Sequence, residues 1–210
     1  MIESIYFKIF YVIASYLLGS VVFGYIIAKI LKKEGFGKVD RPGTAGAGRQ
    51  YGFKAALPTF IFDCGKGALV PLIGRAIGLD TLTIIIASLA VLIGHNWPVF
   101  FKFRGGGGVA TAMGICVSLI TFPFLIVLVF SLSLSFTYKY TLRKKHKVNP
   151  NVVGSLIAII ILPFVVYFFP ALYFFKEPLL YFILTIGIFI IIAVKGILLH
   201  LYYRKIPTAG

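Results

Sequence analysis

Apolar stretches of bilayer length follow one another along almost the whole chain, and this pattern decides what the chain can fold into. A helix that crosses a bilayer needs roughly 18 to 20 largely apolar residues, and several stretches reach or exceed that length. Hydrophobic residues make up 60% of the chain and charged residues only 13%, which is too little polar surface to cover a soluble core. We therefore predict an all-α, polytopic membrane protein in which residues 1–210 form a single integral membrane domain.

Short polar or basic stretches separate the apolar segments. The first segment carries small residues four apart, Ser15 with Gly19 and Ser20 with Gly24, which allow helices to approach closely in lipid. The glycine-rich, basic stretch 32–54 is predicted to be a loop rather than a helix. The predicted apolar segments cover residues 6–31, 55–73, 82–101, 109–140, 152–169 and 179–203.

The positions of the basic residues predict the topology. Lys and Arg gather in residues 32–54, 102–104, 139–147 and 204–205, and the positive-inside rule places these four regions in the cytoplasm. An even number of crossings must then separate the second region from the third. A break of the long segment 109–140 near Pro123 satisfies this condition. The result is about seven transmembrane segments, with the N-terminus outside and the C-terminus cytoplasmic.

A break near Pro123 leaves residues 109–120 too short to cross the bilayer alone. At about 1.5 Å per residue, such a helix falls well below the roughly 30 Å of the hydrocarbon core. Either the helix begins below the membrane surface, with the preceding glycines dipping inward, or the break falls later than Pro123. Non-helical chain at that depth is tolerated where protein buries it or where it lines a watery cavity.

The charge of the chain indicates its partners. Six acidic residues stand against 21 Lys and Arg, a net charge of +15, which favours a membrane surface or anionic small molecules. The basic residues are split among short loops, so nucleic acid is not expected as a partner. Cys64 and Cys116 lie in apolar segments far apart and are interpreted as small hydrophobic residues, not as a disulfide. The apolar start runs on to Leu31, beyond the length of a signal-peptide core, so no cleavable signal is expected.

Four consecutive glycines, Gly105, Gly106, Gly107 and Gly108, follow Lys102 and Arg104 at the start of the segment that begins at Val109. Glycine lets the backbone curl with its N–H groups pointing to one centre. A helix that begins at Val109 adds its unpaired N–H groups and the positive end of its dipole. This arrangement recognises phosphate, and Arg104 stands beside it. The alternative is a flexible hairpin with Lys102 and Arg104 as interfacial anchors.

Three other features bear on this choice. Asp63 and Lys66 are three residues apart in an apolar segment, so they share a helix face. Ionisable residues inside a membrane usually mark a functional site, although these two could simply neutralise each other. His95 and Asn96 precede the glycine run and could belong to the site or to ordinary packing. The stretch 40–52 is a second loop with Gly and Arg on the same predicted side, or else a basic loop attracted to anionic lipid.

The order of these motifs resembles the PlsY-type glycerol-3-phosphate acyltransferases. Gly94 to Thr111, GHNWPVFFKFRGGGGVAT, is similar to the family's GH-x-x-PVF followed by GGKGVAT, and Asp63-x-x-Lys66-Gly67 to its D-x-x-KG. Arg49-x-x-Gly52 is similar to its R-x-x-G. The resemblance covers roughly residues 10 to 160. The chain departs from the family pattern at Gly107, where the family has lysine. It also departs at residues 43–48, which lack the family's two asparagines, and at its C-terminal end, which lacks the HREN-type motif.

The resemblance implies an enzyme of the cell inner (plasma) membrane that transfers an acyl group from acyl-phosphate to glycerol 3-phosphate, making lysophosphatidic acid for phospholipid synthesis. Acyl-phosphate carries a good leaving group, so positioning and charge stabilisation suffice, and no metal or cofactor is expected. The implied reaction-centre residues are His95, Asn96 and Ser155. The residues expected to bind substrate phosphate are Arg49, Lys66, Arg104 and Gly105 to Gly108, with Asp63, Arg41 and Thr44 as further candidates.

Two other functions stay open at this point. A relative of the same fold could bind or transport a phosphorylated amphiphile without acyl transfer, which the missing lysine and asparagines favour. An ordinary small-solute transporter is the third candidate, and the chain has no clear internal repeat to support it.

Overall fold

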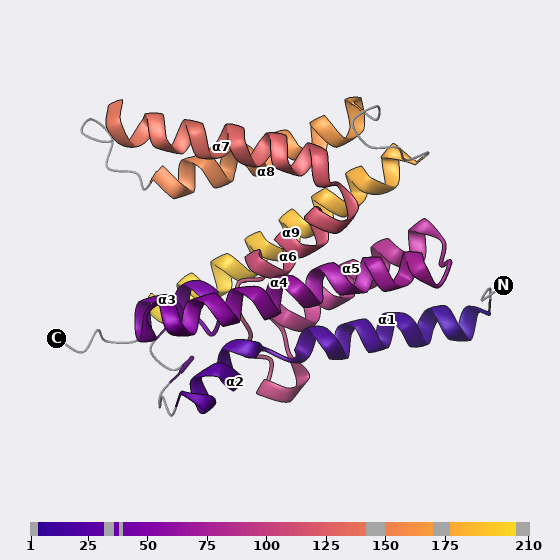
Figure 1. The fold of residues 1–210 in the computed structure, drawn as a ribbon, viewed down its shortest axis with the longest axis horizontal. Coiled ribbons are helices and arrows are strands. Elements are labelled where there is room, and N and C mark those ends of the chain that lie inside the picture. Colours follow the sequence, from indigo (N-terminus) through magenta and orange to yellow (C-terminus); the bar gives the residue numbers. More distant parts are fainter. Residues whose placement is uncertain (1–3, 32–35, 38–39, 142–149, 170–176, 205–210) are drawn as a thin grey trace. The chain divides into compact units, whose positions relative to one another are not determined.

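The computed structural model describes residues 4–31, 36–37, 40–141, 150–169 and 177–204. Every regular element in these ranges is a helix, as predicted (Figure 1). The α-helices are α1 (Ile5–Ser20), α2 (Phe23–Ile30), α3 (Thr44–Tyr51), α4 (Phe53–Ala76), α5 (Thr81–Asn96), α6 (Val109–Leu119), α7 (Thr121–Thr141), α8 (Pro150–Phe168) and α9 (Pro178–Arg204), with a short 3₁₀-helix, η1 (Val99–Phe101), after α5.

Five stretches of the described chain are long and apolar enough to cross a membrane: Ile5–Ile30, Phe53–Ala76, Thr81–Phe101, Thr121–Thr141 and Pro178–Tyr203. Helix α8, with 19 residues, and α6, with 11, are further apolar helices. The count of about seven crossings and their orientation remain predictions. By their internal contacts the helices form two compact units, one of Met1–Ser118 with Gly187–Gly210 and the other of Leu119–Ile186.

In the first unit, α1 and α5 pack along each other through small residues (Figure 1). A Cβ added to Gly19 would collide with the carbonyl group of Val91, and one added to Gly94 would collide with the carbonyl oxygen of Tyr16. The two backbones therefore touch at both glycines, which is the role predicted for the small residues of the first segment. The same contact carries a long-range hydrogen bond, in which the Tyr16 hydroxyl donates to the carbonyl oxygen of Trp97 at 2.8 Å.

Helices α4 and α6 meet in the same way. An added Cβ at Gly67 would collide with the carbonyl oxygen of Thr111, and one at Gly114 with the carbonyl oxygen of Cys64. Close contact with α6 turns one face of α4 inward, and that face carries Asp63 and Lys66, both buried. The two charged residues therefore lie in the interior of the helix group and do not face lipid.

The first apolar segment is broken, although the sequence predicts it as one continuous stretch. Helix α1 ends at Ser20 and α2 begins at Phe23, with Val21 and Val22 in extended conformation between them. The Ser20 hydroxyl donates to the carbonyl oxygen of Tyr16 and lies 3.4 Å from the backbone nitrogen of Val99. Gly19 and Ser20 directly precede the break, and a Gly–Ser pair whose serine bonds back to the carbonyl four residues earlier favours a bend.

The prediction of a loop through residues 32–54 is wrong for Thr44–Tyr51, which form α3, and for Phe53 and Lys54, which begin α4. Gly46 and Ala47 are the buried positions of this helix, and a Cβ at Gly46 would collide with the carbonyl oxygen of Arg41. Close packing therefore fixes a helix in a segment whose glycines favour a loop. Gly52, with a φ of 78°, ends α3, and its N–H donates to the carbonyl oxygen of Gly48 at 3.0 Å.

The long segment after the glycine run is interrupted at Ile120, between α6 and α7, close to the predicted break at Pro123. The alternative of a later break is wrong. An α6 of 11 residues is about 16 Å long, well short of the roughly 30 Å core, so it cannot cross the bilayer alone.

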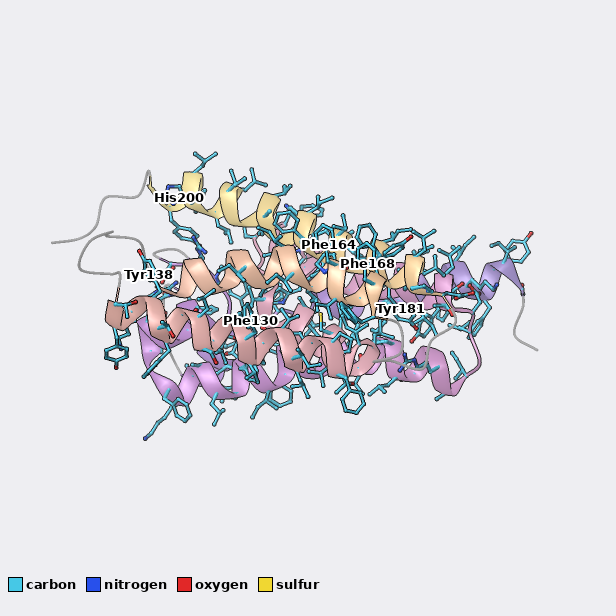
Figure 2. The ribbon with its side chains drawn as sticks, turned by 90° about the horizontal axis from the view of Figure 1, so that it is seen from above. Phe130, Tyr138, Phe164, Phe168, Tyr181 and His200 are labelled. Carbon is cyan, nitrogen blue, oxygen red and sulfur yellow. The ribbon has the colours of Figure 1, made fainter. Side chains whose placement is uncertain are left out.

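In the second unit, α7 and α8 pack side by side. An added Cβ at Gly154 would collide with the hydroxyl of Ser135 and approach the carbonyl oxygen of Ser131. Phe130 on α7 and Phe164 and Phe168 on α8 are each more than half exposed, as expected for side chains that face lipid (Figure 2).

Candidate active site

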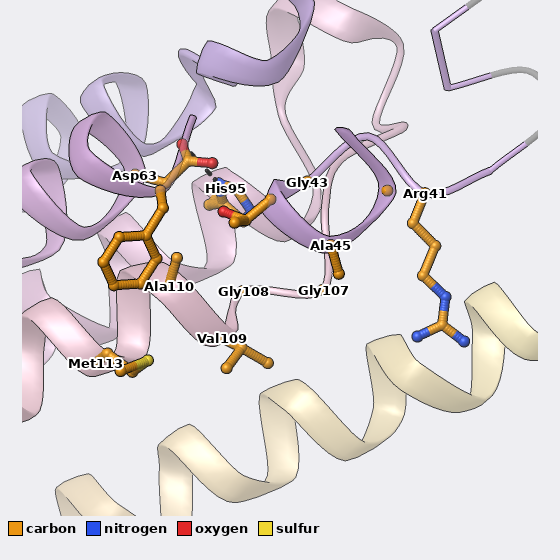
Figure 3. A pocket seen from close by; sticks show the side chains of 13 residues that line it. Arg41, Gly43, Ala45, Asp63, His95, Gly107, Gly108, Val109, Ala110 and Met113 are labelled. Atoms are coloured by element: carbon orange, nitrogen blue, oxygen red, sulfur yellow. Dashed lines mark ion pairs between the residues drawn. The ribbon is translucent and has the colours of Figure 1, made fainter. Parts of the chain in front are cut away.

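A cavity of about 280 Å³ lies where three regions predicted to be functional come together (Figure 3). Its wall is formed by the start of α3, by α4, by the end of α5, by the second half of the glycine run and by the first turns of α6. Of the predicted site residues, it brings together Arg41, Thr44, Asp63, His95, Gly107 and Gly108.

The glycine run lies directly against the end of α5. A Cβ at Gly105 would collide with the carbonyl oxygen of His95, one at Gly106 with the Nε2 atom of His95, and one at Gly108 with the side-chain oxygen of Asn96. Gly108 also has a φ of +79°. A Cβ at Gly107, in contrast, would meet nothing within 4 Å. Close contact with His95 and Asn96 therefore accounts for three of the four glycines.

Two helices begin at the cavity. Gly108, Val109 and Ala110 line it at the start of α6, and Gly43 and Thr44 line it at the start of α3. The N–H groups of a first helical turn have no partner within their own helix, and the helix dipole is positive at that end. Both starts therefore favour an anion in the cavity.

Asp63, Lys66 and His95 form a buried cluster of ionisable side chains at the cavity wall. The Oδ1 atom of Asp63 lies 3.1 Å from the Lys66 ammonium and 3.4 Å from the Nδ1 atom of His95. None of the three residues is more than 2% exposed. His95 and Asp63 line the cavity, whereas Lys66 lies behind them.

Lys66 is bound to the chain break between α1 and α2. Its ammonium donates to the carbonyl oxygens of Gly19 at 2.9 Å and Val21 at 2.7 Å. These bonds satisfy main-chain oxygens that the break leaves without helical partners. The structure thus places Lys66 away from the predicted phosphate contact, although the prediction itself stays untested.

Asn96 is fully buried against the glycine run. Its two side-chain polar atoms, and the hydroxyl oxygens of Thr44 and Thr111, have no hydrogen-bond partner among the described residues. Buried polar atoms without partners are uncommon, and they mark places where a bound molecule or water completes the hydrogen bonding.

Arg49 lies outside this cavity, in a second, more open recess of about 450 Å³ lined by Asp40, Arg41, Arg49, His200 and Tyr203. Arg41 lines both recesses. The Nε and Nη2 atoms of Arg49 donate to the two oxygens of Asp40 at 2.6 and 2.9 Å. His200 had no role assigned from sequence, because no motif surrounds it.

The Asp40–Arg49 pair sets the charge state of this recess. Partial burial alone would raise the pKa of Asp40, but the hydrogen bonds from Arg49 and from the Arg41 N–H outweigh it and lower that pKa. The hydrogen bond to Asp40 raises the pKa of Arg49. Both groups are therefore ionised at neutral pH, and Nη1 of Arg49 makes no hydrogen bond to a described residue.

Arg104 and Ser155 are two further residues of the site predicted from the sequence. The Arg104 guanidinium lies 5.9 Å from the centre of the Tyr202 ring, and its carbonyl oxygen accepts a hydrogen bond from Tyr25; Arg104 does not line the cavity. Ser155 belongs to α8, in the second compact unit, and its side chain lies outside the described part of the structure.

These features define a class: a polytopic helical membrane protein with a buried Asp–Lys–His cluster beside a glycine-lined cavity suited to an anion. A family model described as "Glycerol-3-phosphate acyltransferase" matches residues 9–202. The chain belongs to that family.

Individual relatives agree with this assignment. The glycerol-3-phosphate acyltransferase of Thermoanaerobacter pseudethanolicus is 41% identical over 110 residues, which cover 51% of this chain and 54% of that protein. The enzyme of the same name from Shouchella clausii is 41% identical over 116 residues, covering 52% of this chain and 55% of that protein. The matched region thus spans about half the length of these relatives.

Solved structures match over nearly the whole chain. A crystal structure of PlsY, an integral membrane glycerol 3-phosphate acyltransferase, in its lysophosphatidic acid form has a TM-score of 0.68 and 28% identity, and covers 97% of this chain and 95% of that one. The glycerol 3-phosphate form has a TM-score of 0.67 and 27% identity, covering 97% and 96%. The fold is therefore that of an integral membrane protein, and the alternative of a non-catalytic amphiphile binder is not favoured.

Proposed function

We propose that this protein transfers an acyl group from acyl-phosphate to glycerol 3-phosphate and so makes lysophosphatidic acid. The observation that carries the proposal is the cavity in which the glycine run, the starts of α3 and α6, Arg41 and His95 converge. Family membership supports it, as do the glycerol 3-phosphate and lysophosphatidic acid forms of the similar crystal structures.

The reaction brings together two substrates that both carry phosphate, and two recesses among the described residues share Arg41. In the open recess, Arg41, Nη1 of Arg49 and His200 suit the phosphate of a small, water-soluble acceptor. In the deeper cavity, helix starts and glycine N–H groups suit the phosphate of the acyl donor. Val109 and Met113, which line the same cavity, offer apolar surface to the start of an acyl chain.

No metal or nucleophilic side chain is needed for this chemistry. The phosphate of acyl-phosphate leaves with its electron pair, and donors fixed in advance stabilise the charge that develops on it. Holding the acceptor hydroxyl next to the acyl carbon supplies the remaining acceleration. We place residues 1–210 in one membrane domain of the inner (plasma) membrane, with both recesses facing the cytoplasm.

The test is to measure phosphate release from acyl-phosphate by the purified protein in detergent or nanodiscs, with the product identified by mass spectrometry. Release should depend on glycerol 3-phosphate and should yield one lysophosphatidic acid per phosphate. A protein that binds a phosphorylated ligand but releases no phosphate with any acceptor would contradict the proposal.

A further inference from the structure

A turn between α5 and the glycine run carries large apolar and basic side chains on the outside of the fold. We propose that this turn, residues 99–104, binds phospholipids with anionic headgroups at the cytoplasmic face of the membrane. We call it the aromatic–basic turn. Lipid binding at this turn is separate from acyl transfer, so the inference goes beyond the proposed function.

The exposed side chains of the turn are the first observation. Phe100 is 58% exposed and Phe103 is 57% exposed, and Lys102 between them is exposed as well. Among the described residues, the Lys102 ammonium has no hydrogen-bond or ion-pair partner. The aromatic–basic turn therefore presents two apolar rings and one unpaired cation outside the fold.

The backbone of the turn is the second observation. Lys102 and Phe103 have φ of 51° and 59°, and they are the only non-glycine residues of the described chain with positive φ. A hydrogen bond from the Phe103 N–H to the carbonyl oxygen of Pro98, at 2.9 Å, closes the turn. Glycine adopts positive φ without steric cost, whereas bulky residues rarely adopt it. The chain thus keeps two large side chains where glycine would relieve the backbone, and such strain gathers at functional positions.

The inner side of the turn fixes its direction. The Phe101 ring stacks on the ring of Tyr25 in α2, with centroids 4.5 Å apart and 10° between the planes. The Tyr25 hydroxyl also donates to the carbonyl oxygen of Arg104 at 3.0 Å. Phe101 therefore holds the turn against the fold, while Phe100 and Phe103 remain on its outer side.

The place of the turn at the end of a membrane-spanning stretch indicates the partner. The stretch Thr81–Phe101 ends within the turn, and the positive-inside rule puts this end in the cytoplasm. Aromatic rings at that level enter the boundary between headgroups and acyl chains, and a lysine beside them reaches the phosphate layer. Anionic lipids give the cytoplasmic leaflet its negative surface potential, so an unpaired ammonium there favours them over zwitterionic lipids.

The single tryptophan of the chain, Trp97, provides a local probe for the test. Trp97 is partly exposed and lies two positions before the turn. Its fluorescence can be measured on the full chain in nanodiscs made of equal parts phosphatidylglycerol and phosphatidylcholine, with the acyl chains of one lipid brominated as quenchers. Quenching should show a preference of about fivefold for phosphatidylglycerol, the effect of one cation near an anionic surface. Equal quenching by the two lipids would overturn the inference.

Lys102→Gln tests whether the turn is the source of this preference. The preference should fall below about twofold, because the unpaired cation is lost. Lys139→Gln removes an exposed lysine of α7 and should leave the preference unchanged. Both variants keep the buried Lys195, whose ammonium lies 5.2 Å from the centre of the Trp97 ring. A full preference in Lys102→Gln would assign lipid selection to another cation and overturn the inference.

Lys102→Gly separates lipid binding from a structural role of the side chain. It removes the charge and also relieves the positive φ, so the lipid preference should be lost. Tm should not fall, because the relieved strain offsets the greater freedom that glycine gives the unfolded chain. A clearly lower Tm would show that the Lys102 side chain supports the fold, and would overturn the inference.

Phe100→Ala/Phe103→Ala tests the aromatic contact with lipid. Without the two rings the turn should withdraw from the bilayer, and quenching by both brominated lipids should decrease. Phe53→Ala removes an even more exposed phenylalanine, at the start of α4, and should leave quenching unchanged. Undiminished quenching in the double variant would show that the turn does not lie at the lipid boundary.

Inorganic phosphate distinguishes a lipid headgroup from a free anion. Added at constant ionic strength, it should leave the preference for phosphatidylglycerol unchanged, since the two rings select a phosphate that is held in a bilayer. Competition by inorganic phosphate would show a site for the free anion and overturn the inference. Every one of these measurements is made without acyl transfer, so their failure would leave the proposed function intact.

Discussion

The ammonium of Lys66 donates to the carbonyl oxygen of Val21 at 2.7 Å and so joins the middle of α4 to a break 45 positions earlier in the chain. The same ammonium donates to the carbonyl oxygen of Gly19 at 2.9 Å and lies 3.1 Å from the carboxylate of Asp63. The Lys66 side chain thus binds the main chain of the α1–α2 break and also pairs with Asp63, which contacts His95. Loss of this side chain should therefore disturb the break, the ion pair and the orientation of His95 together.

Lys66→Met should strongly destabilise the protein. The change leaves Asp63 buried without its cation, and the loss of one partner of a buried pair costs about 3 to 5 kcal/mol. Thermal unfolding in detergent should show a large decrease of Tm. The double variant Asp63→Asn/Lys66→Met removes both charges and should recover part of the loss. A double variant no more stable than Lys66→Met would mean that the lost hydrogen bonds to Gly19 and Val21, and not the unpaired carboxylate, account for the loss of stability.

Neighbouring glycines of the run should respond differently to alanine. Gly106→Ala places a methyl group against Nε2 of His95, and such overpacking typically costs about 1 to 3 kcal/mol. Gly107→Ala adds the same methyl group where nothing lies within 4 Å, so its Tm should match that of the wild type. Tm and acyl transfer measured side by side on the two variants check this. Equal Tm values would contradict the packing of the glycine run described above.

Local spacing was enough to predict some of this architecture. Asp63 and Lys66 are three apart, so helix geometry alone places them on one face, and the structure pairs them. The small residues of the first segment predicted a close helix contact, and Gly19 forms one with Val91. The break at Ile120 lies close to the predicted position at Pro123. In each case the sequence pattern lies at, or within a few residues of, the structural feature that it predicts.

Other features depend on distant partners. The α1–α2 break follows Gly19 and Ser20, but the hydrogen bonds to its carbonyl oxygens come from Lys66, far along the chain. Helix α3 was predicted as a loop because glycine disfavours helices, but Gly46 is needed for contact with Arg41. Arg49 was expected beside the glycine run and instead pairs with Asp40 in a recess completed by His200. Tertiary contacts decide all three.

Arg49→Ala should abolish most of the glycerol 3-phosphate-dependent activity without unfolding the protein. The Arg49 side chain is 57% exposed, and an exposed ion pair contributes only about 0 to 1 kcal/mol to stability. Loss of a charged phosphate partner costs about 2 kcal/mol or more, so kcat/KM should fall thirtyfold or more. Asp40→Asn breaks the same ion pair but keeps the guanidinium, and should have the smaller effect on KM. Equal losses in the two variants would assign Arg49 a structural role.

The contribution of Asp80 to stability should disappear in acid. Asp80 caps α5 by accepting from the Thr83 N–H at 3.0 Å, and it pairs with Lys8. Burial would raise the pKa of Asp80, but the bonds from Lys8 and Thr83 outweigh it and lower that pKa in the folded state. The stabilisation is therefore present above the ordinary pKa of about 4 and is lost as the pH falls further. Asp80→Asn keeps a capping side chain but removes the charge, so it should be less stable than the wild type by about 0.2 to 1 kcal/mol at pH 7. Urea titrations should show the two proteins converging below pH 4, and a constant difference would contradict the ionic origin.

Gly107→Lys should strengthen binding of the phosphorylated donor. The family pattern has lysine at this position, the φ of Gly107 is not positive, and a Cβ there meets nothing within 4 Å, so the backbone accepts a side chain at this position. Its ammonium would join Arg41 at a cavity that already favours an anion. KM for acyl-phosphate should fall several-fold, and the effect should weaken as ionic strength rises, because salt screens exposed charges. Gly107→Met, with a side chain of similar length and no charge, is the matched control. If Met and Lys change KM equally, added apolar contact explains the effect, and the cavity does not bind the donor through charge at this position.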